Sequence, residues 1–187
     1  MSTAKRLHYS YDDYLSLLEQ SSFKLEYCDG VIYAMAGGTP THAALAAAMI
    51  GVLRQAVKPS CLVFSSDLKL RIESSDLSTF PDASVVCGPQ KVSARDANAL
   101  TNPAIVVEVT SRSTEDYDRG DKLSHYKQLA SLRVVLFVSH RARAITVVQR
   151  TSSGWEEKEV RGGERVDTAE VAFPVDDIYA GIGLDLA

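Results

Sequence analysis

The sequence predicts an α/β fold in one domain that spans residues 1–187. Two apolar stretches, Ile105–Val109 and Val134–Val138, enclose a helical stretch. A strand, a helix and a further strand in this order are typical of parallel pairing with a right-handed crossover. Hairpin signals elsewhere require antiparallel pairs, so we expect a mixed sheet. No repeat or linker divides the chain, and its length is sufficient for one sizeable core.

The N-terminal part predicts a short helix followed by a β-hairpin. An amphipathic helix over Tyr11–Glu19 begins with a capping box, in which a serine precedes an acidic residue by three positions. Asp29–Gly30, a pair that tolerates positive φ, separates two strand-like stretches over Phe23–Tyr27 and Val31–Met35.

A long alanine-rich helix begins near Thr41 and ends before Pro59. His42 lies in its first turn. A single histidine at this place is more often a surface or capping residue than a ligand, so the residue pattern leaves open whether His42 belongs to a site.

The middle of the chain predicts further strands. Alternation of apolar and polar residues over Asp67–Ile72 indicates a half-buried strand. We expect a polar connection over Glu73–Thr79, a second strand within Phe80–Cys87 and a short helix around Ala94–Leu100.

The C-terminal part predicts a hairpin over Ala144–Gln149 and Trp155–Val160, then a closing strand and a short helix within Val171–Leu186. A single tryptophan is more often a packing residue than a base-stacking one, so we assign Trp155 to packing. We interpret the turn His140–Arg143 as solvated rather than as a phosphate contact.

Composition places the chain among ordinary globular proteins. It is 45% hydrophobic and 24% charged, and no stretch approaches the roughly 20 apolar residues of a membrane span, so we expect a soluble, cytoplasmic protein with no membrane partner. Cys28, Cys61 and Cys87 are odd in number and lack CxxC spacing, so we expect buried thiols in a reducing cytoplasm. The net charge of −4 argues against a constitutive nucleic-acid binder.

Glu108 interrupts the apolar run Ile105–Val109. An ionised carboxylate in a buried strand is costly unless a positive group meets it. A core ion pair is one explanation. Asp82, however, lies at the start of another apolar strand, and two strands that each present a carboxylate indicate a cation site. A hard divalent ion such as Mg²⁺ binds through one or two carboxylates and completes its shell with water and phosphate.

The helix that follows this strand carries a candidate lysine. Ser113 or Thr114 can cap the helix, and acidic residues in the first turn suit its positive end. Asp118, Lys122 and Tyr126 recur every four residues and therefore share one face. If this face lies toward the strand end, the ammonium of Lys122 lies beside the acids.

These residues carry a resemblance to the PD-(D/E)XK nuclease superfamily and, within it, to the Uma-two family of restriction endonuclease-like proteins. The matching positions are Pro81–Asp82, Val107–Glu108–Val109, Asp118 and Lys122. The superfamily pattern places a lysine two residues after the second acid, where this chain has Thr110. Members of the family are similar in having moved the lysine into the following helix, which makes Lys122 the match.

The resemblance implies a restriction-endonuclease-like mixed central sheet flanked by helices, with an N-terminal helix and β-hairpin. It also implies a metal-dependent endonuclease that acts on DNA as a homodimer. In that interpretation Asp82, Glu108 and the Val109 carbonyl hold Mg²⁺ or Mn²⁺, and Lys122 stabilises the developing charge or orients the nucleophile. Glu26, which the strand pattern alone leaves as an exposed acid or a site residue, becomes a third carboxylate.

A catalytically inactive module that binds nucleic acid or a protein partner is the alternative. A fold shared by enzymes and by proteins that have lost catalysis does not certify activity. The retained acids and lysine favour the enzyme, whereas the acidic isoelectric point, near 5.6, favours the module.

Overall fold

The computed structural model describes residues 7–35, 37–111 and 114–184. In chain order the elements are α1 (Tyr11–Gln20), β1 (Leu25–Cys28), β2 (Val31–Ala34), α2 (Pro40–Ala56), β3 (Cys61–Ser65), β4 (Lys69–Ile72), a 3-10 turn (Glu73–Ser75), β5 (Leu77–Thr79), β6 (Ala83–Cys87), β7 (Val92–Ser93), β8 (Asp96–Leu100), β9 (Ile105–Val109), α3 (Glu115–Tyr117), a π-helical segment (Asp118–Lys122), α4 (Leu123–Tyr126), β10 (Val134–Val138), β11 (Ala144–Thr151), β12 (Gly154–Arg161), β13 (Arg165–Asp167), β14 (Ala172–Pro174) and α5 (Asp176–Tyr179).

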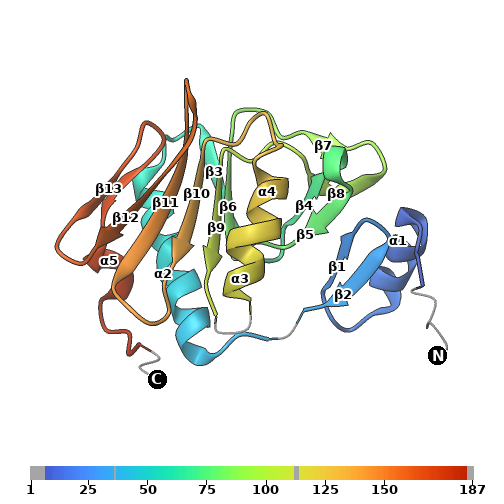
Figure 1. The fold of residues 1–187 in the computed structure, drawn as a ribbon, viewed down its shortest axis with the longest axis horizontal. Helices are drawn as coiled ribbons and strands as arrows, with labels where there is room; N and C mark the ends of the chain where they lie inside the picture. The colour runs from blue at the N-terminus through green and yellow to red at the C-terminus, as the bar shows by residue number, and fades with distance from the viewer. Residues whose placement is uncertain (1–6, 36, 112–113, 185–187) are drawn as a thin grey trace.

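The central sheet is mixed, with strand order β12-β11-β10-β9-β6-β3 (Figure 1). β9 and β10 are parallel and pair Glu108 with Phe137, whereas the other neighbours in this sheet are antiparallel. The predicted strand, helix and strand unit is therefore confirmed. A second sheet of order β2-β1-β5-β4-β8-β7 and a small β13-β14 pair complete the architecture, which confirms the α/β class.

Helices cover both faces of the central sheet. Because alternate strand residues point to opposite sides, each strand contributes side chains to the core on each face. Val107 and Val109 pack with Leu45 and other residues of α2. Val106 lies on the opposite face in a core that contains Tyr126 of α4 and also residues of the second sheet. The helix that carries Lys122 is thus held between the two sheets.

The N-terminal helix and hairpin form as predicted. Ser10 and Asp13 make both hydrogen bonds of a capping box at the start of α1. The turn between β1 and β2 has φ of 43° at Asp29 and 80° at Gly30. The positive φ at Gly30 is the reason this turn favours glycine; the exposed ring of His8 packs against the space that a Cβ would occupy.

The second sheet corrects three predictions. The predicted helix around Ala94–Leu100 is the strand β8, because pairing with β4 outweighs the helix propensity of its alanines and leucine. The predicted connection Glu73–Thr79 contains β5, an internal strand between β1 and β4. β4 is buried on both faces rather than half-buried, because Lys69 and Arg71 each meet an acidic partner.

The expectation of three free thiols is wrong. β3 and β6 pair in antiparallel register with Cys61 opposite Cys87, and the two form a disulfide. Cys28 is free and half-buried. The pairing of strands brings together two cysteines whose spacing in the sequence carries no signal. The inference of a reducing compartment from unpaired thiols therefore loses its basis.

The C-terminal hairpin is confirmed as β11 and β12, and the closing strand and helix as β14 and α5. Trp155 packs against the second core, with the guanidinium of Arg150 4.6 Å from its ring centre, as expected for a packing residue. None of the helices within the described residues is long and apolar enough to cross a membrane.

Candidate active site

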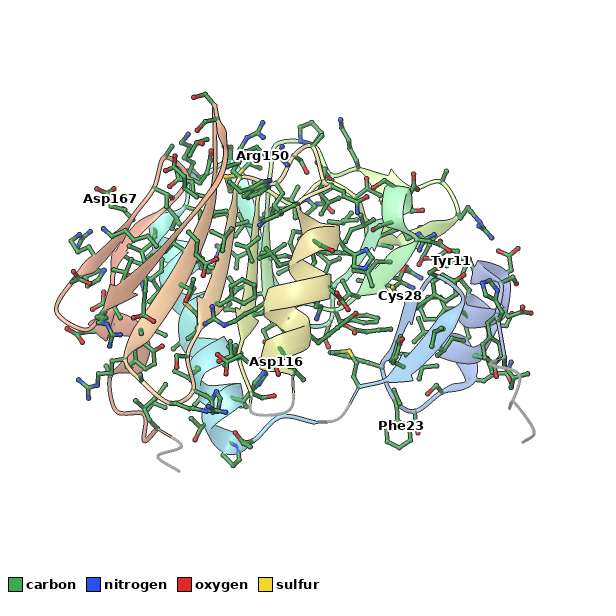
Figure 2. The ribbon with its side chains drawn as sticks, in the orientation of Figure 1. Tyr11, Phe23, Cys28, Asp116, Arg150 and Asp167 are labelled. Atoms are coloured by element: carbon green, nitrogen blue, oxygen red, sulfur yellow. A yellow bond between two sulfur atoms is a disulfide. The ribbon has the colours of Figure 1, made fainter. Side chains whose placement is uncertain are left out.

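The buried glutamate of β9 has two partners on the helix that crosses the sheet face. Glu108 is 4% exposed, accepts a hydrogen bond from the hydroxyl of Tyr126, and lies 3.0 Å from Nζ of Lys122. The predicted positive partner of Glu108 is therefore present. Figure 2 shows the side chains between this helix and the strands behind it.

Lys122 meets more than one acid. Its Nζ lies 3.3 Å from Glu26 and 3.6 Å from Asp118, in addition to Glu108. Lys122 and Asp118 are at the two ends of the π-helical segment, a rare backbone form that is frequently found at functional sites. The predicted shared face of Asp118, Lys122 and Tyr126 is confirmed, since all three are buried.

Glu26 reaches the cluster from the hairpin. It is 7% exposed, so the reading of Glu26 as an exposed strand acid is wrong. Its Oε1 also accepts hydrogen bonds from the hydroxyl of Thr79 and from the backbone N–H of Phe80, at 3.4 Å. Sequence reasoning missed Thr79, because the stretch that contains it has the polar composition of a connection.

Asp82 lies beside the backbone that follows Glu108. Its Oδ2 accepts a hydrogen bond of 2.7 Å from the N–H of Val109. Antiparallel pairing of β6 with β9 places Ala83 opposite Val107, so Asp82 comes level with the end of β9. The two predicted acids therefore come together from strands that are neighbours in the sheet.

His42 joins the site through Asp82, a possibility that the sequence left open. Nε2 of His42 lies 3.3 Å from Oδ2 of Asp82. Thr39 caps α2 and so fixes the turn that carries the histidine. A Cβ at Gly38 would lie 2.6 Å from Nδ1 of His42, so glycine gives the ring room to pack against the backbone.

Acids outnumber cations in this cluster, and the pKa values show the imbalance. Burial raises the pKa of Glu108 to about 8, against the attraction of Lys122. Burial also raises the pKa of Asp118. Burial by itself would lower the pKa of Lys122, but the carboxylates, Glu108 foremost, outweigh it and raise that pKa well above its usual range. The hydrogen bond to Asp82 raises the pKa of His42 despite its burial.

The cluster is nearly closed to solvent. The side chains of Glu108 and Lys122 are 5% exposed, whereas those of Asp82 and His42 are 15% and 22% exposed. A ligand therefore reaches the cluster most directly over Asp82 and His42. A separate groove of about 590 Å³ lies between α1 and β8. None of Glu26, Glu108 or Lys122 lines it, so we do not assign the chemistry to it.

The oxygen donors fit a hard cation that binds through few protein ligands. Among the described residues, no three His, Cys, Asp or Glu side chains form a ready metal cage. Mg²⁺ does not need one, because it usually takes one or two carboxylates and retains water. Asp82 and Glu108 supply two, and the raised pKa of Glu108 indicates that a further positive charge would stabilise its ionised form.

Position 110 differs from the superfamily pattern in space as well as in sequence. Thr110 is 1% exposed, and its hydroxyl lies 3.2 Å from Nδ1 of His140. His140 itself is 5% exposed, so our reading of its turn as solvated is wrong for this residue. A lysine at position 110 would have to displace His140, whereas Lys122 reaches Glu108 from the helix without such a conflict.

Comparison with known proteins gives a consistent result. A model of the Uma2 (Uma-two) family, described as "Putative restriction endonuclease", matches residues 11–179. "Uncharacterized protein slr1290" of Synechocystis sp. is 33% identical over 175 residues, which cover 91% of this chain and 91% of that protein. "Uncharacterized protein sll1609" of the same organism is 26% identical over 163 residues, or 86% and 90% of the two chains.

A crystal structure described as "a putative nuclease belonging to DUF820", from Anabaena variabilis, matches the fold. The TM-score is 0.73 at 18% sequence identity, and the match covers 90% of this chain and 96% of that one. At this identity the likeness concerns the fold, and it confirms the predicted restriction-endonuclease-like α/β architecture.

Proposed function

This chain belongs to the Uma2 family, and from that membership and the cluster around Lys122 we propose that it is a metal-dependent endonuclease that hydrolyses phosphodiester bonds in DNA. The observation that carries the proposal is the convergence of three acids, Glu26, Glu108 and Asp118, on Lys122. Asp82 lies beside this cluster, where it accepts a hydrogen bond from the backbone N–H of Val109. Structural ion pairs are common, but a buried lysine with three acids is more than a pair requires.

In this mechanism Asp82, Glu108 and the Val109 carbonyl would hold Mg²⁺ or Mn²⁺, which would supply polarisation of the phosphate and help in activating water. Lys122 supplies positive charge near the oxygens on which negative charge develops. Glu26 positions the ammonium of Lys122 from the side opposite the helix, and His42 orients the Asp82 carboxylate.

The test is metal-dependent cleavage of supercoiled plasmid and of a short DNA duplex. We expect cleavage with Mg²⁺ or Mn²⁺ and none with EDTA. Asp82→Asn and Glu108→Gln each replace a carboxylate by an amide of nearly the same size. Each variant thereby loses the negative charge that would bind the metal ion, so both should lose cleavage. Arg161→Gln, a change at an exposed residue of β12, is the matched control and should cleave as the wild type does. Equal cleavage by Asp82→Asn and the wild type would overturn the proposal.

The second candidate function is a non-catalytic binding module. The net charge of −4 and the burial of Lys122 behind three carboxylates favour it, because both reduce the attraction of a phosphate backbone. Absence of cleavage together with absence of any metal-dependent change in thermal stability would favour the module over the enzyme.

A further inference from the structure

Two exposed tyrosines lie on elements that also contribute residues to the Lys122 cluster or adjoin it in the chain. Tyr33 is 47% exposed and Tyr117 is 36% exposed. Most tyrosines elsewhere in the described residues are packed away; those exposed by 2% or less are Tyr11, Tyr14, Tyr27, Tyr126 and Tyr179. Tyr33 and Tyr117 therefore differ from the rings that build the core.

Both rings are placed by elements that also place site residues. Tyr33 is directly opposite Glu26 in the register of β1 and β2, so the two side chains lie on the same face of the hairpin. Tyr117 immediately precedes Asp118, the acid at the start of the π-helical segment. The hairpin and the helix that follows Tyr117 are far apart in the sequence, but Glu26 lies 3.3 Å from Lys122, and Sγ of Cys28 lies 3.7 Å from Nε2 of His125 in α4.

The electrostatic neighbours of Tyr117 lie in the cluster and in the hairpin. Burial raises the pKa of Tyr117, and the charge of Glu26 raises it further. Lys122 acts in the opposite direction, and Cys28 and Tyr33 contribute from the hairpin side. The ring of Tyr117 therefore lies across from the hairpin, within electrostatic reach of the cluster.

The charge of the site does not suit binding through phosphates alone. Proteins that follow a duplex backbone use exposed lysines and arginines. Here the ammonium of Lys122 is buried and already shared among three carboxylates, and the whole chain has a net charge of −4. Aromatic rings offer another source of affinity, because unstacked bases bind them through their faces. Bases within a duplex are not available in this way.

We propose that Tyr33 and Tyr117 stack the bases of an unpaired DNA strand that enters the site, so that the substrate is single-stranded or has a splayed end. This inference rests on the proposed function and specifies its substrate class. Because the energy comes from stacking, affinity should depend only weakly on salt, in contrast to binding through many phosphates.

The test measures binding separately from cleavage. Fluorescein-labelled oligonucleotides of about 12 nucleotides, within the site size of single-strand binding modules, are titrated with the Asp82→Asn variant in EDTA, as single strands and as the matching duplex. We expect the single strand to bind more tightly than the duplex. Tyr33→Ala and Tyr117→Ala should each weaken single-strand binding about five- to 150-fold, the range for one lost base stack. Tyr33→Phe and Tyr117→Phe should retain most of the affinity.

Leu62→Ala is the control for loss of an exposed apolar side chain, since Leu62 is 44% exposed on β3 and should not affect binding. Tighter binding of the duplex, or unchanged single-strand binding by both alanine variants, would overturn the inference. Ring-dependent single-strand binding by a protein that never cleaves DNA would support the stacking surface and reject the nuclease. Cleavage restricted to duplex DNA, with no effect of either ring, would reject the stacking surface and leave the nuclease.

Discussion

Two lysines among the described residues are buried, and they lie in two different kinds of cluster. Lys69 of β4 lies 2.6 Å from Asp96, and that acid also accepts hydrogen bonds from Tyr11 and from the backbone N–H of Asn98. Lys122 is equally buried but faces three carboxylates. One cluster is balanced in charge and the other is not.

The pKa values of the acids follow this difference. Burial alone would raise the pKa of Asp96, but hydrogen bonds and the charge of Lys69 outweigh it, and the pKa is lowered. Burial raises the pKa of Glu108 to about 8 and also raises that of Asp118, since one lysine cannot satisfy both. The balanced buried pair of Lys69 and Asp96 joins the neighbouring strands β4 and β8 of one sheet, whereas an excess of buried acid indicates a place for a further cation.

The largest expected effect concerns the balanced cluster. Lys69→Met leaves Asp96 buried without its cation, and removal of one partner of a buried pair typically costs about 3–5 kcal/mol of unfolding free energy. Urea denaturation followed by circular dichroism measures it. The double variant Lys69→Met/Asp96→Asn should recover part of the loss. A single variant as stable as the wild type would show that this cluster does not stabilise the fold.

The next effect concerns the unbalanced cluster. Lys122→Ala should reduce DNA cleavage by about 100-fold or more, the scale for loss of one electrostatic donor at a reacting centre. Metal binding should persist, because Asp82 and Glu108 remain. Plasmid nicking measures the rate, and metal-induced thermal shifts measure binding. Cleavage at the wild-type rate would reject the role of Lys122, whatever the effect on stability.

The two clusters should respond to pH in opposite directions. The pKa of Glu108 is higher in the folded state than in the unfolded chain. Its contribution to the unfolding free energy is therefore present at low pH and is lost as pH rises from the unfolded-state pKa toward the folded-state pKa of about 8. That of Asp96 is lowered, so its contribution is lost as pH falls. In EDTA we expect the unfolding free energy to fall by ~2 kcal/mol between about pH 5.5 and 7, at about 1.4 kcal/mol per pH unit in the window between the two pKa values.

Glu108→Gln is the control for this pH dependence, because an amide does not titrate. Denaturation curves at several pH values should be flatter for this variant than for the wild type. Identical slopes in the two proteins would show that Glu108 does not control the loss at high pH.

The smallest expected effect is stabilisation of the folded protein by Mg²⁺ bound at the unbalanced cluster. A ligand that binds only the folded state stabilises it by mass action, about 1.4 kcal/mol at tenfold excess over its dissociation constant. Mg²⁺ should therefore raise the melting temperature of the wild type. Asp82→Asn should abolish this Mg²⁺-induced rise in melting temperature. Asp96→Asn should lower the stability of the protein but retain the Mg²⁺-induced rise. A shift of equal size in Asp82→Asn would place the ion elsewhere.

Much of the site was predictable, because helix and strand periodicity determines which residues share a face. Glu108 stood out as a charged residue within the apolar run of β9. The four-residue spacing placed Asp118, Lys122 and Tyr126 on one face of the following helix. The position of Glu26 was not predictable from the residues alone, since its burial depends on β5, a strand that the polar composition of its segment conceals.

By itself, the sequence determined the elements whose signals are local: the capping box of α1, the Asp29–Gly30 turn, and the parallel strands β9 and β10 with their helix. Only the tertiary structure decided which distant groups meet. Cys61 bonds Cys87, Lys69 finds Asp96, and β8 becomes a strand through its pairing with β4. Each outcome depends on the register between segments far apart in the chain, and no local pattern records that register.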